Sequence, residues 1–420
     1  MSVRLFAAAL LACAAMPATA ETVAIVNADI VTMGPGGEIA RGTIVVRDGI
    51  IIAVGDKVTP PAGARIVDAK GGVVTPGLVA PITNLGLVEI RSIAGSDDRG
   101  AANPQISAAL DAGDGLNPDS VLIPVARLGG ITRSITVPGY ARRGDNLFAG
   151  QAAAVQLGVD GPMLVRRGVA MVLELGEGGA ERAGGARGAA MRMLTTVLDD
   201  ARDHARRRSG YDLGQTRHYA LSGADLDALL PVAEGRMPLL VTVNRASDIR
   251  ELLAFAKAQH LRLIIEGAAE GWRVADEIAA AKVPVVLTPI KNVPASFEML
   301  GATLGNATKL RAAGVLIAFE GNGPQREREL RHNAGNVVAY GLSRADALAA
   351  ITINPARIFG LADRIGSLEP GKDGDLVIWD GDPLETTSRP QAIFVRGVAQ
   401  PMTSRQTELR DRYLPGRKPS

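Results

Sequence analysis

Short apolar runs separated by turn residues occur at both ends of the chain. Near the N-terminus, runs rich in Val and Ile occupy residues 23–27, 42–55 and 65–68. Asp48 and Gly49 divide the middle run at a hairpin turn, because Gly accepts the positive φ that such turns need. A similar pattern returns in residues 375–379 and 392–397. We therefore expect both chain ends to build one small β-sandwich, with the residues between them inserted into it.

The central part of the chain alternates apolar strands with helical segments. The predicted strands in this part include residues 131–137, 152–157, 169–175, 239–243, 261–266, 283–287 and 315–320. The predicted helices of its second half are residues 247–259, 271–281, 296–312 and 327–340. Parallel strands with crossover helices bury both faces of each strand, so this pattern predicts an α/β fold, a (β/α)₈ TIM-like barrel. A doubly wound open sheet is the structural alternative, although no Gly-rich dinucleotide fingerprint follows a strand.

The first twenty residues are typical of an export signal. Arg4 supplies positive charge, residues 5–15 are apolar, and small residues end the segment at Ala20. The apolar run is shorter than the roughly 20 residues that span a bilayer, so we expect no transmembrane segment. The sequence predicts an exported, periplasmic protein, and the alternative is a lipoprotein anchored at Cys13.

Composition narrows the classes of function. The chain has 420 residues and is 47% hydrophobic, with 46 Lys and Arg against 44 Asp and Glu. This near balance argues against a nucleic-acid footprint or a basic membrane surface. Four histidines and one cysteine exclude a cysteine-built zinc or iron–sulfur site and a disulfide scaffold.

Two motifs carry a family resemblance. Residues 72–79 read Gly-Val-Val-Thr-Pro-Gly-Leu-Val, and residues 354–379 begin Asn-Pro-Ala-Arg and end Gly-Asp-Leu-Val-Ile-Trp. Together with the two-part β-sandwich, they resemble the amidohydrolase superfamily, in particular its imidazolonepropionase-like exported bacterial members. The resemblance implies a barrel at residues 76–364 between two β-sandwich parts at residues 21–75 and 365–400. The signal peptide at residues 1–20 precedes them, and a polar C-terminal tail at residues 401–420 follows.

The resemblance also implies zinc or another divalent metal at the carboxyl ends of the barrel strands. Its usual ligands are a His-x-His after the first strand, a carboxylated Lys on the fourth, histidines ending the fifth and sixth, and an Asp ending the eighth. The corresponding positions in this chain hold Ile82, Asn84, Val172, Thr242, Asn244, Glu266, and Glu320 or Asn322. The usual metal ligands are therefore not present in the sequence, and we assign no metal-ligating residue or cofactor.

The polar residues left at the predicted barrel mouth are candidates for other chemistry. Glu266 and Glu320 are the candidate catalytic residues, since two carboxylates with different pKa values can act as an acid/base pair. The candidate substrate-binding residues are Asn84, Thr242, Asn244 and Asn322. The same oxygen atoms could instead hold Ca²⁺ or Mg²⁺, or the glutamates could be polar caps of the strand ends.

The histidines lie elsewhere in the sequence. We interpret His204, His218 and His260 as solvated or helix-capping side chains, and keep His332 as a minor candidate for the barrel mouth. By resemblance the protein is a hydrolase of carbon–nitrogen bonds in non-peptide or cyclic amides, with its activity altered or lost. The alternative is a pseudoenzyme of the cell envelope that binds a small molecule, forms a homo-oligomer or pairs with an active homologue.

Overall fold

The computed structural model describes residues 21–90, 93–140, 146–321 and 326–414. The predicted export signal and Cys13 lie outside the described residues. Within the described part, no helix is both long enough and apolar enough to cross a membrane.

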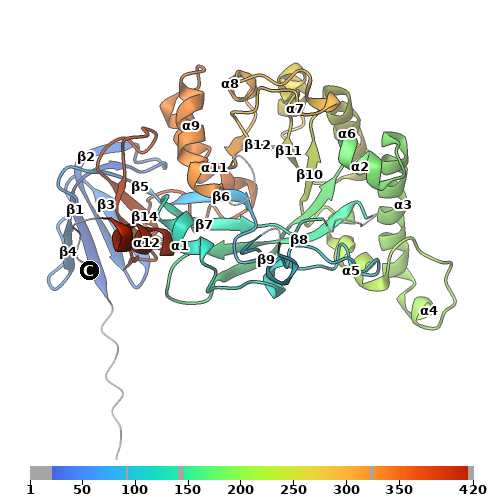
Figure 1. Cartoon of the computed structure of the whole chain (residues 1–420), viewed down its shortest axis with the longest axis horizontal. Helices are drawn as coiled ribbons and strands as arrows, with labels where there is room; N and C mark the ends of the chain where they lie inside the picture. Colours follow the sequence, from blue (N-terminus) through green and yellow to red (C-terminus); the bar gives the residue numbers. More distant parts are fainter. Residues whose placement is uncertain (1–20, 91–92, 141–145, 322–325, 415–420) are drawn as a thin grey trace, which may run out of the picture.

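One eight-stranded sheet combines segments from both ends of the chain (Figure 1). Its strands are β1 (Thr22–Val31), β2 (Glu38–Arg47), β3 (Ile50–Gly55), β4 (Arg65–Asp68), β5 (Val73–Pro76), β14 (Leu376–Trp379), β15 (Pro390–Val395) and β16 (Val398–Ala399). The two ends join where β5 pairs with β14 in antiparallel register, with Thr75 opposite Val377. Asp48 and Gly49 both have positive φ, at 50° and 81°, and form the predicted hairpin turn between β2 and β3. The description of this unit as a two-layer sandwich stays a prediction.

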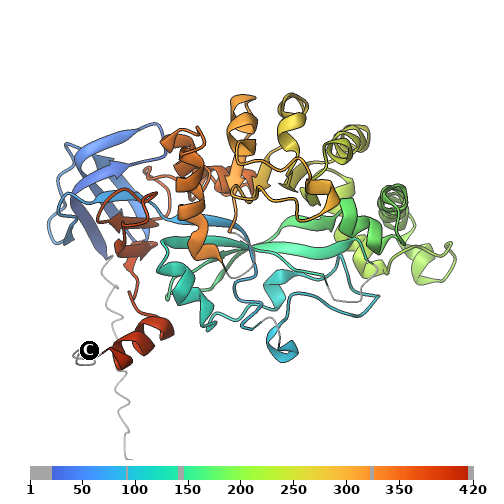
Figure 2. The same ribbon diagram turned by 45° about the horizontal axis from the view of Figure 1, so that its top comes forward.

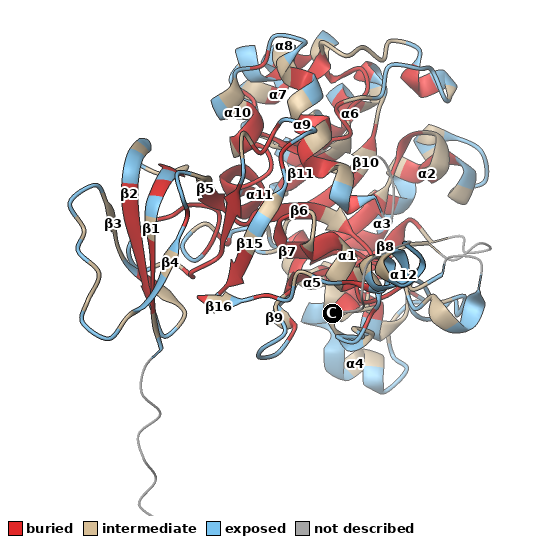
Figure 3. Ribbon diagram, turned by 60° about the vertical axis from the view of Figure 1, so that its left-hand side comes forward, coloured by how far each residue is buried: buried red, intermediate tan, exposed pale blue. Residues whose placement is uncertain are grey.

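A second eight-stranded sheet forms a nearly closed barrel. Its strands are β6 (Leu78–Thr83), β7 (Ile131–Thr136), β8 (Phe148–Gln156), β9 (Leu164–Glu174), β10 (Leu239–Val243), β11 (Leu263–Gly267), β12 (Val285–Leu287) and β13 (Ile317–Phe319). The barrel interior is filled by apolar side chains such as Val79, Ile135 and Val286. Figure 3 shows that most of the barrel sheet is buried, and the start of β9 is an exposed exception.

One strand departs from the predicted all-parallel (β/α)₈ pattern. β8 runs antiparallel to both β7 and β9, and the described residues between these three strands form no crossover helix. The connections are residues 137–147 and residues 157–163, each shorter than the dozen or more residues that a parallel crossover needs. Their length therefore forces neighbouring strands to reverse direction.

Helices accompany the remaining strands. They are α1 (Leu122–Arg127), α2 (Gly176–Arg182), α3 (Arg187–Arg206), α4 (Arg208–Asp212), α5 (Gly223–Ala233), α6 (Ala246–Gln259), α7 (Ala275–Ala280), α8 (Asn306–Ala312), α9 (Leu330–Val338), α10 (Arg344–Ala349), α11 (Ile353–Ile358) and α12 (Arg405–Tyr413). The 3₁₀ turns are η1 (Ala94–Ser96), η2 (Ala112–Asp114), η3 (Gly271–Arg273), η4 (Phe297–Met299) and η5 (Glu327–Glu329). Helices α6 to α9 stand in a row along one side of the barrel sheet (Figures 1 and 2).

Two predicted helices are shorter than their sequence pattern suggests. The segment 296–312 contains η4 and α8 with Gly301 and Gly305 between them, and these glycines lower the stability of a continuous helix. The segment 271–281 likewise divides into η3 and α7. Both breaks lie in segments that follow the carboxyl ends of barrel strands, namely β11 and β12.

Candidate active site

A cavity of about 1150 Å³ opens at the carboxyl ends of the barrel strands. The polar side chains that line it come from strand ends and from the loops that follow: Thr83, Asn84, Asp97, Arg99, Tyr140, Glu174, Arg182, Thr242, Glu266, Thr288, Lys291 and Glu320. Ile82 and Val172 add apolar surface. The carboxyl ends of parallel strands are where this architecture places its active sites, so this cavity is the candidate site.

Glu266 is the fourth residue of β11 and points into the cavity beside the neighbouring strand. The Thr242 hydroxyl of β10 donates a hydrogen bond of 2.8 Å to its Oε2. Burial raises the pKa of Glu266, the Thr242 hydroxyl and the charge of Lys291 oppose that rise, and the charge of Glu174 adds to it. A carboxylate in this setting is more basic than one in water.

Glu320 follows β13 directly and lines the same cavity. The Thr288 hydroxyl, after β12, donates a hydrogen bond of 2.6 Å to its Oε1. Burial, reinforced by the negative charge of Glu266, raises the pKa of Glu320 to about 8. Glu320 is therefore mostly protonated at neutral pH and can donate a proton.

A second polar cluster borders the cavity at the end of β9. Arg182 of α2 donates from Nε to Glu174 Oε2 at 2.8 Å, and its guanidinium carbon lies 3.9 Å from the centre of the Tyr140 ring. Burial, together with the charges of Glu174 and Glu266, raises the pKa of Tyr140 well above its ordinary value. Tyr140 stays a neutral phenol, and its hydroxyl donates to the Leu147 carbonyl at 3.2 Å.

Sequence reasoning missed these residues, because no periodic pattern marks a loop tyrosine or a helical arginine as part of a strand-end site. The one available signal was Glu174 itself, which is the last residue of β9 and stands one residue before the end of the predicted strand 169–175. A search for charged residues near strand ends includes Glu174. Tyr140 and Arg182 come from a loop and a helix, and only the tertiary structure brings them to the cavity.

The predicted substrate-binding residues separate into three groups. Asn84 and Thr242 line the cavity, and the Asn84 amide donates from Nδ2 to the Val137 carbonyl at 2.9 Å. Asn244 does not line it: its Nδ2 donates to Glu298 Oε1 at 2.9 Å, which turns the side chain toward η4 and a smaller adjoining pocket. Asn322 lies outside the described residues.

The histidines are remote from the cavity lining. His204 is not solvated as predicted: it continues the buried stripe of α3, packs edge-on against Tyr211 with ring centres 4.6 Å apart, and places Nε2 3.3 Å from Asp227. His260 caps the C-terminus of α6, and His218 is exposed. His332 lines a separate pocket beside α1 and α12, so its candidacy for the barrel mouth is wrong.

The chain is similar to proteins of the amidohydrolase family. Residues 279–404 match the model of the amidohydrolase family. The crystal structure of an amidohydrolase from Thermotoga maritima superposes with a TM-score of 0.80 at 26% identity, covering 90% of this chain and 99% of that one. Sequence and structure therefore both support a relation of this chain to the amidohydrolase superfamily.

Two relatives are similar to this chain over most of its length. An imidazolonepropionase of Mesorhizobium japonicum is 24% identical over 408 residues, which cover 90% of this chain and 95% of that protein. The amidohydrolase tasK of Hapsidospora irregularis is 24% identical over 401 residues, or 86% of this chain. The present chain spans only 40% of the length of tasK.

The cavity lining contains no histidine in the described part of the chain, whereas resemblance to the superfamily implies a histidine-based metal centre. Ile82 and Val172 offer no donor atom, and Glu174 is engaged by a guanidinium. Among the residues that the structure describes, no group of three or more His, Cys, Asp or Glu side chains is arranged to hold a metal ion. We therefore derive no chemical step through a metal and consider only what these side chains can do themselves.

Proposed function

We propose that this amidohydrolase-superfamily protein hydrolyses a carbon–nitrogen bond of a small amide or cyclic amide, with Glu266 and Glu320 as general base and general acid. One observation carries the proposal: two carboxyl groups from β11 and β13 line the same cavity, and the pKa of one of them is raised to about 8. Two carboxyl groups whose environments separate their pKa values are the usual basis of an acid/base pair.

The proposed reaction needs one water molecule. Glu266, as a carboxylate, accepts a proton from the water molecule. At the same time the water oxygen forms a bond to the amide carbon. Glu320, as carboxylic acid, then donates its proton to the nitrogen as the carbon–nitrogen bond breaks. Lys291 lines the cavity and its charge lowers the pKa values of both glutamates, so its ammonium is the candidate for stabilising the negative oxygen.

The test is an assay of the purified protein against a panel of amides, lactams and dipeptides. Glu266→Gln and Glu320→Gln keep the size of each side chain and remove its acid/base function. Glu251→Gln, at an exposed position on α6, is the matched control. We expect each cavity variant to lose at least about 100-fold in rate and the control to retain full rate. Activity that survives both cavity substitutions contradicts the assignment.

A non-catalytic role is the second candidate, and the hydrogen bonding of the cavity favours it. Each of the three cavity glutamates already has a protein partner, namely Thr242, Thr288 or Arg182. The protein would then bind a small molecule without turnover, as a homo-oligomer or as a partner of an active homologue. Ligand binding by calorimetry without product formation, together with the mass of the particle in solution, distinguishes this role from catalysis.

We further propose that the protein is exported to the periplasm. The support is the sequence of residues 1–20, with lipidation at Cys13 as the alternative. The mass of the mature N-terminus decides between them, since cleavage after Ala20 removes Cys13 and lipidation retains it. A full-length chain in the cytoplasm contradicts both.

A further inference from the structure

The barrel has a second pocket at the end opposite to the candidate active site. This pocket has a volume of about 230 Å³ and lies where β7 and β9 begin and β8 ends. It is bounded on its other side by residues 361–365, which follow α11, and by Asp373 and Arg396 from the end of the chain. It therefore lies between the barrel and the sheet built from both chain ends.

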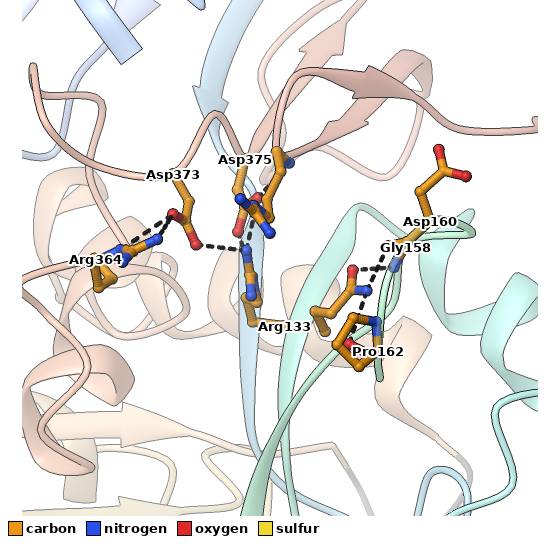
Figure 4. A network of polar contacts seen from close by, with 9 residues as sticks. Arg133, Gly158, Asp160, Pro162, Arg364, Asp373 and Asp375 are labelled. Carbon is orange, nitrogen blue, oxygen red and sulfur yellow. Dashed lines mark hydrogen bonds and ion pairs between the residues drawn. The ribbon is translucent and has the colours of Figure 1, made fainter. Parts of the chain in front are cut away.

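A buried arginine lies at the centre of this region (Figure 4). The Arg133 side chain is only 5% exposed and donates from Nε to Asp375 at 2.5 Å and from Nη2 to Asp373 at 2.9 Å. Arg364 binds the other oxygen of Asp373 through Nε and Nη2. Neither arginine donates from Nη1 to the described part of the chain, so each keeps donor capacity beyond the carboxylates.

The pocket region has one guanidinium group more than carboxylates. Arg133, Arg364 and Arg396 line the pocket, and Asp373 of the lining and the adjacent Asp375 form ion pairs with the first two. The Arg396 backbone N–H donates to Asp375, but its guanidinium has no carboxylate within ion-pair distance among residues 21–90, 93–140, 146–321 and 326–414. An anion is the ligand that complements this lining, and guanidinium groups match the planar geometry of a carboxylate.

Most of the remaining lining is apolar, with Ser134 and Gln156 as its neutral polar members. The apolar side chains include Ala154, Val155, Leu164, Val165, Leu361 and Ile365. The Gln156 amide holds the adjoining β8–β9 turn, accepting from Gly158 N at 2.9 Å and donating to the Asp160 carbonyl at 2.8 Å. The wall that faces the arginines is thus fixed by hydrogen bonds as well as by strand pairing.

From these observations we propose that the pocket binds a small monocarboxylate with a short apolar tail, separately from the candidate active site. Arg396 and the free Nη1 groups receive the carboxylate, and Val165 and Leu361 contact the tail. The volume is below the roughly 300–1,000 Å³ of sites for drug-sized ligands, so the ligand is small. Because the pocket lies between barrel and sheet, occupation stabilises their contact by mass action.

The experiment titrates the full purified chain with sodium hexanoate by isothermal calorimetry, with hexan-1-ol and inorganic phosphate as comparison probes. We expect saturable binding of hexanoate and at least about tenfold weaker binding of the alcohol and the phosphate. Equal binding of hexanol contradicts the role of the arginines, and equal or tighter binding of phosphate contradicts the role of the apolar wall. No saturable binding of hexanoate overturns the site.

Variants locate the site. Arg396→Gln removes the unpaired guanidinium while leaving the buried Arg133 cluster, and we expect about tenfold weaker binding of hexanoate. Val165→Trp fills the pocket from its exposed edge and abolishes binding. Arg192→Gln, an exposed arginine on α3, is the charge-matched control and leaves affinity unchanged. If Arg396→Gln binds as tightly as the unmodified chain, the assignment is wrong.

One further variant separates this site from the proposed catalytic one. Glu320→Gln changes the barrel mouth and leaves the opposite end intact, so its hexanoate affinity stays at the level of the unmodified protein. A loss of hexanoate binding in Glu320→Gln places the carboxylate in the large cavity and overturns the second site. Hydrolysis of amides is not needed for any of these outcomes.

Discussion

Replacing Glu320 with Gln should change the way in which stability depends on pH. Burial raises the pKa of this carboxyl group from 4.5 to about 8, so the folded chain holds a proton that the unfolded chain releases. The contribution of this group to the free energy of unfolding is fully present below pH 4.5 and is lost as the pH rises toward 8. Glutamine keeps an acceptor for the Thr288 hydroxyl and cannot ionise, so it removes this dependence.

The magnitude follows from the two pKa values. Between pH 5 and pH 7 the linkage relation gives a loss of about 2.5 kcal/mol in the free energy of unfolding, because one pKa unit corresponds to about 1.4 kcal/mol. Between pH 5 and pH 7, the free energy of unfolding of Glu320→Gln should therefore fall by about 2.5 kcal/mol less than that of the unmodified chain. The other carboxyl groups are the same in both chains, so their contributions cancel when the two free energies of unfolding are subtracted at each pH.

Urea denaturation followed by circular dichroism at pH 5, 6, 7 and 8 measures the effect. Glu251→Gln, at its exposed position on α6, should follow the unmodified protein at every pH. If the unfolding free energies of Glu320→Gln and the unmodified chain fall in parallel from pH 5 to pH 8, Glu320 is not a protonated acid in the folded state. The acid role proposed for it then fails as well.

Three further predictions concern activity and packing. If Glu320 is the general acid, the rate of amide hydrolysis falls as pH rises through about 8, and a rate that stays constant to pH 9.5 argues against this role. Arg133→Met leaves the buried Asp375 without its cation and Asp373 with Arg364 alone, and should cost about 3–5 kcal/mol in urea denaturation, while Arg192→Met costs little. Gly77→Ala places a methyl group 2.0 Å from Thr132 Oγ1 and should lower stability by about 1–3 kcal/mol, and adding Thr132→Ala should restore part of it, or the contact is not the cause.

The parts of the fold that the sequence predicted well depend on local signals. Asp48 and Gly49 form a hairpin because both adopt positive φ, which short polar residues and glycine tolerate. The eight barrel strands were found because apolar runs of this length need burial on both faces. The direction of β8 was not predictable from its own residues, since it is set by the length of the connections on either side.

The candidate site also contains residues that the sequence predicts and residues whose positions depend on tertiary contacts. Glu266 and Glu320 were found because strand ends converge in a barrel, whatever the loops do. Asn244 directly follows β10. Its side chain turns away from the cavity because it donates a hydrogen bond to Glu298 in η4, 54 residues further along the chain. Contacts of this kind depend on the geometry of the loops. The sequence therefore predicts which residues lie at the barrel mouth, but it does not predict the direction of each side chain.

The antiparallel pairing of β5 with β14 has a consequence for how the protein is made. The paired strands lie about 300 residues apart in the chain, so β5 leaves the ribosome long before its partner exists. At a synthesis rate of roughly 5–20 residues per second, the unpaired edge of β5 waits about 15–60 s, and loop closure over that distance is slow. During this interval the nascent chain presents an open strand edge that other chains can pair with. A chaperone that shields the first 76 residues would therefore raise the yield of folded protein more than one that acts on the finished barrel.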